Sequence, residues 1–136
     1  MKSFIILPII LFFSFTCAAQ EQTNIIQTLA NTSSNIKVAL NGKVKVIEWD
    51  KPYVRVSTNI AIEGVRKGIL KHLVAASRYK LSSTVTEGVL LIEAPKLKKD
   101  VTIQGKRLKE AFNYEIFVPK SSHIVLKQEE KASTSL

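Results

Sequence analysis

The chain has 136 residues, a formal net charge of +9 and 46% hydrophobic residues. This length fits one domain of ordinary size with a modest core. The only cysteine, Cys17, excludes an intrachain disulfide framework, so packing and sheet hydrogen bonds must hold the domain together. The positive charge favours anionic partners, such as phospholipid head groups, lipopolysaccharide, acidic glycans or DNA.

Residues 1–19 have the layout of a secretory signal peptide. Lys2 precedes an apolar run over residues 4–15, and Cys17 and two alanines end the segment. We predict cleavage after Ala19 and export to the periplasm, the outer surface or the medium. In the alternative, Cys17 is the lipidated cysteine of a lipoprotein. We favour cleavage because the bulky Phe15 precedes Cys17 by two residues, where lipidation prefers small residues.

Residues 20–35 are predicted to form a leading strand or a linker, and residues 36–127 a single β-rich domain. From residue 36 onward, apolar and polar residues alternate, as in strands with one solvated face. Asn41-Gly42 separates two such runs and predicts a type I′ hairpin turn. A third alternating run follows over residues 54–57, so we expect three consecutive antiparallel strands.

The periodicity changes over residues 64–77, where apolar residues recur at helical spacing. We predict an amphipathic helix that contains Gly68, with Lys67, Lys71 and Arg78 together on its solvated face.

Strand patterns return after the helix and continue to residue 126, and residues 128–136 form a polar tail. The predicted fold class is therefore mainly β, with short antiparallel or solenoid-like strands and one helix. A sandwich, a β-roll and a short solenoid all fit this pattern.

Three segments resemble one family. Val44-Lys45-Val46, Trp49-Asp50 and Val54-Arg55-Val56 resemble its Val-x-Val, Trp-Asp, Val-x-Val unit. Residues 88–95 resemble its unit of Gly, apolar strand and Pro, and residues 114–120 resemble its strand ending in Val-Pro. On these residues, segment 36–126 is similar to bacterial exported proteins proposed to be adhesins, or adhesin head domains of auto-transporters. The resemblance implies a β-solenoid-like stack at the cell surface and carries over no catalytic residue.

The sequence contains no recognisable catalytic or metal-binding motif. His72 and His123 are the only histidines, and Asp50 and Asp100 are the only aspartates. Neither histidine has an orienting acid and a nucleophile at a useful spacing. We therefore expect no enzymatic activity, no metal and no cofactor.

The densest group of basic residues is the candidate ligand-binding site, and we call it the basic cluster. It consists of Lys96, Lys98, Lys99, Lys106, Arg107 and Lys109. One interpretation is a site for an acidic glycan, lipopolysaccharide or lipid head groups. The other is a solvated face whose lysines protect an edge strand. Few aromatic residues accompany the cluster, so nucleic acid is a less favoured partner.

Export, strand-rich patterning and the missing catalytic set together predict a non-enzymatic envelope or cell-surface domain, adhesin-like in character. The alternative is a basic binding module for an anionic ligand. A protein partner that adds a strand to a sheet edge is a further candidate.

Overall fold

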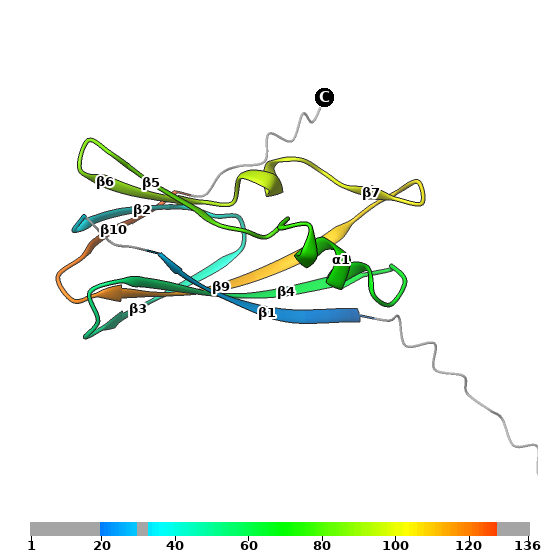
Figure 1. The fold of residues 1–136 in the computed structure, drawn as a ribbon, viewed down its shortest axis with the longest axis horizontal. Coiled ribbons are helices and arrows are strands. Elements are labelled where there is room, and N and C mark those ends of the chain that lie inside the picture. The colour runs from blue at the N-terminus through cyan, green and yellow to red at the C-terminus, as the bar shows by residue number, and fades with distance from the viewer. Residues whose placement is uncertain (1–19, 30–32, 128–136) are drawn as a thin grey trace, which may run out of the picture.

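The computed structural model describes residues 20–29 and 33–127, so the predicted signal peptide and polar tail lie outside the described residues. Two four-stranded sheets lie face to face, with the main core between them (Figure 1). Sheet 1 has the strand order β1-β4-β9-β3, and sheet 2 has the order β10-β2-β6-β5. The mainly-β fold class is confirmed, and the arrangement is that of a sandwich.

The elements in chain order are β1 (Gln20–Leu29), β2 (Asn35–Ala39), β3 (Lys43–Trp49), β4 (Val54–Glu63), α1 (Ile69–Ala75), β5 (Ser82–Thr86), β6 (Val89–Glu93), the 3-10 helix η1 (Pro95–Lys98), β7 (Thr102–Ile103), β8 (Lys106–Arg107), β9 (Lys109–Pro119) and β10 (His123–Leu126). The leading segment thus forms a strand, which pairs along its full length with β4. No helix within the described ranges is long and apolar enough to cross a membrane.

Both sheets mix antiparallel and parallel pairs. The long strands β1, β4 and β9 are antiparallel neighbours, whereas β3 runs parallel to β9. In sheet 2, β2 runs parallel to both β6 and β10. Alternate residues of each sheet point into the shared core, where Val56, Ile92 and Ile116 are completely buried.

The predicted hairpin at Asn41-Gly42 is wrong. β2 belongs to sheet 2 and β3 to sheet 1, so this connection crosses from one sheet to the other. Alternation shows which side chains are buried, but it does not show which strand lies beside which. Gly42 is needed for another reason: its φ is 137°, and a Cβ at this position would lie 2.6 Å from the Phe112 carbonyl oxygen.

The predicted helix exists, but it begins later than residue 64. Gly68 precedes α1 as its N-cap in a left-handed conformation, with φ of 95°, instead of lying inside the helix. The Glu21 carboxylate of β1 accepts hydrogen bonds from the backbone N–H groups of Gly68 and Leu70. Leu70 is also buried in a second core cluster. The hydrogen bonds to Glu21 and the burial of Leu70 together hold α1 against sheet 1.

We expect Gly42→Ala to destabilise the protein by about 2–4 kcal/mol, because the methyl group would collide with backbone and the φ value suits only glycine. Urea unfolding measures the change. Gly105→Ala is the matched control: Gly105 also has a positive φ, of 76°, but nothing lies within 4 Å of its added Cβ. Equal losses for the two variants would contradict the close-approach explanation.

Candidate functional site

A buried ion pair organises the end of the domain that carries α1 and η1. Arg78 follows α1, and its Nε and Nη2 atoms donate to the two carboxylate oxygens of Glu110 on β9, the first at 3.0 Å. The side chains of Arg78 and Glu110 are only 8% and 9% exposed. This hydrogen bond raises the pKa of the Arg78 guanidinium above its ordinary value, against the opposing effect of burial.

Arg78 also fixes η1. Its Nη1 atom donates to the carbonyl oxygens of Lys96 and Lys99, at 3.1 and 3.2 Å. The guanidinium thus bridges the residues after α1, the η1 turn and β9 through one planar group. The predicted position of Arg78 on a solvated helix face is wrong, because the residue lies beyond the end of the short helix and is 7% exposed.

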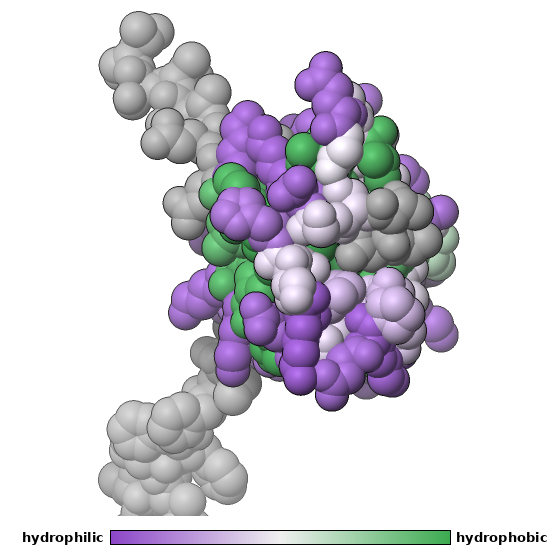
Figure 2. Space-filling view, turned by 90° about the vertical axis from the view of Figure 1, so that its left-hand side faces the viewer, coloured by the Kyte–Doolittle hydropathy of each residue, from purple (hydrophilic) through white to green (hydrophobic). Residues whose placement is uncertain are grey.

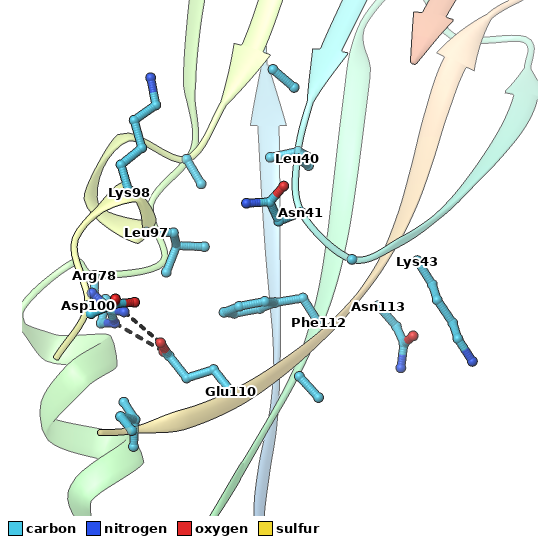
Figure 3. Close-up of a pocket in the computed structure, with 15 residues that line it drawn as sticks. Leu40, Asn41, Lys43, Arg78, Leu97, Lys98, Asp100, Glu110, Phe112 and Asn113 are labelled. Carbon is cyan, nitrogen blue, oxygen red and sulfur yellow. Dashed lines mark hydrogen bonds and ion pairs between the residues drawn. The ribbon is translucent and has the colours of Figure 1, made fainter. Parts of the chain in front are cut away.

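A cleft of about 520 Å³, which we call the η1 cleft, opens beside this ion pair. Figure 3 shows the Phe112 ring extending into the cleft toward the η1 side, with Leu40 and Asn41 from the β2–β3 connection near it. Leu97 of η1 lies across from Phe112, and it packs against both core clusters. The floor of the cleft is therefore apolar, with Arg78 and Glu110 paired at one side.

Of the three basic-cluster residues on and next to η1, Lys98 lines this cleft, whereas Lys96 and Lys99 are not among its lining residues. Lys96 Nζ donates to the Ala76 carbonyl oxygen at 2.8 Å, and Lys98 pairs with Glu93 at 3.2 Å. The Lys98 side chain extends away from the cleft interior (Figure 3). All three lysines are exposed, and the charged residues that line the cleft are Lys43, Arg78, Lys98, Asp100 and Glu110.

The other half of the basic cluster lies in a second cleft, of about 690 Å³, which we call the hairpin cleft. The β7–β8 hairpin forms one wall, and the β4–α1 connection forms the other. Its lining residues are Glu63, Gly64, Val65, Arg66, Ile69, Ile103, Gln104, Lys106, Arg107 and Lys109. The structure thus separates the basic cluster into two groups of three.

Charge in the hairpin cleft is predominantly positive. Four cations line it, and Glu63 is the one carboxylate among the lining residues. Arg107 makes an exposed ion pair with Asp100 at 2.9 Å, whereas Lys106 and Lys109 are exposed and make no ion pair with the described residues. The sequence prediction missed Arg66, because it was expected inside the helix; its position after Gly64 in the β4–α1 connection instead brings it to the cleft.

The described residues contain no cluster of side chains that could hold a metal ion. Across residues 20–29 and 33–127, no three His, Cys, Asp or Glu side chains come together where they could hold a metal ion. His72 on α1 and His123 on β10 are both exposed.

No protein-family model and no curated relative matches the chain. Among solved structures, it is similar to a proposed cell adhesion protein from Clostridium sporogenes ATCC 15579, with 14% identity and a TM-score of 0.40 over 79% of this chain and 47% of that one. It is also similar to a proposed adhesin from Bacteroides fragilis NCTC 9343, with 15% identity and a TM-score of 0.39 over 78% and 40%. The chain spans less than half the length of either structure. Its function is inferred from the geometry of its own residues.

Replacing Arg78 by methionine should cost about 3–5 kcal/mol, because Glu110 would remain buried without a partner. Urea unfolding of Arg78→Met and of the double variant Arg78→Met with Glu110→Leu measures this, and the double variant should recover most of the loss. Arg107→Met is the control: its pair with Asp100 is exposed, so the expected loss is below about 1 kcal/mol. Equal losses at the two arginines would contradict the bridging role.

Alkaline pH should also destabilise the fold. Burial raises the pKa of the Tyr114 hydroxyl above its ordinary value, and the nearby Glu110 charge raises it further. The folded state therefore keeps the proton after the unfolded chain has released it. The contribution of the Tyr114 proton to the free energy of unfolding is therefore complete below about pH 10. It decreases as pH rises beyond that value, by up to about 1.4 kcal/mol per pH unit.

Tyr114→Phe tests this dependence, because it removes a hydroxyl that is buried without a hydrogen-bond partner among the described residues. Stability measured at pH 7 should stay equal or rise slightly, and the loss of stability above pH 10 should become shallower. An unchanged alkaline slope would contradict the assignment.

Proposed function

We propose that this protein is an exported, non-enzymatic β-domain of the cell envelope or surface, adhesin-like, that binds an anionic ligand in the hairpin cleft. The proposal depends on one observation: four cations surround a cleft of about 690 Å³ whose lining includes a single carboxylate. Such a concave, positively charged surface attracts anions and loses that attraction as salt screens it.

The lining favours an acidic glycan or an anionic lipid head group over nucleic acid. The hairpin cleft contains no aromatic side chain on which a base could stack. Lysine and arginine donors on separate walls, Lys106 on β8 and Arg66 before α1, suit carboxylate, sulfate or phosphate groups that project from a polymer or a membrane. Export is supported by the signal-peptide pattern of residues 1–19.

The test uses the purified exported protein with heparin, phosphatidylglycerol vesicles and phosphatidylcholine vesicles over a salt titration. Lys106→Gln with Lys109→Gln should weaken binding of the anionic probe by roughly three- to thirtyfold at low salt, which corresponds to two exposed charge contacts. Binding to heparin but not to the anionic vesicles would indicate an acidic glycan as the ligand, and the reverse result would indicate a lipid head group. Neutral vesicles should not bind.

Lys80→Gln with Lys127→Gln is the matched control. Both lysines are exposed and lie outside the clefts, so this variant removes the same charge from elsewhere on the surface. Equal weakening by the two variants would mean that net charge alone attracts the probe. That outcome, or binding that salt does not weaken, would overturn the hairpin cleft as the site.

A further inference from the structure

The outer face of sheet 1, which is turned away from the core, has an uncharged centre. The strand register places Asn24 opposite Asn59 and Asn59 opposite Asn113, so three asparagines form a row across β1, β4 and β9. In the neighbouring row, Ala61 lies between Gln22 and Ala111. Because the alanines are small, a hollow of about 460 Å³ remains between the amide side chains.

All residues that line this hollow are uncharged. They are Gln22, Thr23, Asn24, Asn59, Ile60, Ala61, Ala111 and Asn113. In the next row on one side, Glu63 lies opposite Lys109, and in the next row on the other side, Glu115 lies opposite Lys45. At the β3 end of the asparagine row, Lys43 lies opposite Asn113. Charge thus returns at once beyond the hollow, within a chain of net charge +9. A charged ligand would find no counter-ion among the lining residues, whereas a ligand rich in hydroxyl groups would find amides.

The amides keep unused hydrogen-bonding capacity. Asn24 Nδ2 donates to Ser57 Oγ at 2.9 Å and to Asn59 Oδ1 at 2.7 Å. The second bond fixes the orientation of the Asn59 amide and leaves its NH2 group as a donor. The side chains of Gln22 and Asn113 make no hydrogen bonds with the described residues, and each offers two donors and one acceptor. Such an amide can donate a hydrogen bond to one hydroxyl group and accept one from a neighbouring hydroxyl group.

The same face carries an aromatic cluster farther along β9. Asn113 and Phe117 are both outward residues of β9 and lie about 13 Å apart along the strand. Trp49 packs on Phe117 with ring centroids 5.3 Å apart, and Tyr53 packs on Trp49 at 5.1 Å. Lys51 and Arg55 lie against the Trp49 and Tyr53 rings. Because Trp49 lies opposite Pro119, two residues farther along β9, Phe117 is nearer to the hollow than Trp49 by register. Figure 2 shows the end of the domain at which β9 ends, where hydrophilic and pale residues lie side by side.

We propose that the outer face of sheet 1 binds a neutral oligosaccharide. The amides of Gln22, Asn59 and Asn113 would bind its hydroxyl groups, and a C–H face of a further sugar unit would pack on Phe117. This site shares no lining residue with the hairpin cleft, so it goes beyond the anionic-ligand function and does not depend on it.

Side-chain amide signals in NMR spectra of the purified exported protein test the proposal. Cello-, malto- and chito-oligosaccharides are added at millimolar concentrations. At least one should shift the NH2 signals of Gln22, Asn59 and Asn113, and added salt should leave the shifts unchanged. If none of the three sugars shifts these signals, the proposal is wrong.

Ala111→Leu fills the hollow and should weaken the saccharide at least about tenfold. Ala75→Leu makes the same change at an exposed position of α1 and should have no effect. The dispersion of the backbone amide signals of Ala111→Leu should match that of the unsubstituted protein, which shows that the variant is folded whether or not the hairpin cleft binds an anion. If both leucine variants bind the saccharide equally well, the hollow is not the site.

Discussion

The Arg78 guanidinium is the constraint on which one end of this sandwich depends. Its two contacts with Glu110 and its two contacts with the Lys96 and Lys99 carbonyls engage both of its terminal nitrogens and Nε. A buried charge pair carries a desolvation penalty of several kcal/mol per ion, which only good geometry and additional hydrogen bonds offset. A lysine ammonium could not reproduce the planar fork, so the bridge requires arginine.

The buried Arg78–Glu110 pair also determines how the nearby lysines are presented on the surface. Glu110 neutralises the buried Arg78 cation, and the carbonyl contacts of Arg78 hold the η1 backbone in place together with the Lys96 and Lys98 side chains. Lys96, Lys98 and Lys99 are consequently presented from a fixed turn, although two of them are already engaged with Ala76 and Glu93. The hairpin cleft differs, because Lys106 and Lys109 remain exposed without such partners. The cations of the hairpin cleft are therefore more available to an anionic ligand than the lysines of η1.

Local patterns in the sequence predicted most strands and the existence of the helix, because alternation and helical spacing report directly on burial. They failed where long-range pairing decides the outcome. Asn41-Gly42 is compatible with a hairpin, yet the chain uses it to cross between sheets, and only the approach of Gly42 to Phe112 explains the glycine. The basic cluster was visible in the sequence, but its division into two groups was not. Arg66 was missed because the helix begins later than its apolar spacing predicts, which leaves this residue in the β4–α1 connection. The three-asparagine row was missed because it depends on register between distant strands.

Strand β9 connects these features through simple alternation. Its even-numbered residues face inward, so Glu110 meets Arg78 while Tyr114, Ile116 and Val118 build the core. Its odd-numbered residues face outward, so Lys109 lines the hairpin cleft, Ala111 and Asn113 line the uncharged hollow, and Phe117 joins the aromatic cluster. The outward residues of β9 therefore run from the Lys109 cation through Ala111 and Asn113 to the Glu115 carboxylate and the Phe117 ring, and this order is set by one strand whose opposite face is fixed by the core. Because the cation of the hairpin cleft and the amide of the uncharged hollow occupy different positions of the same strand, substitutions can alter one without touching the other.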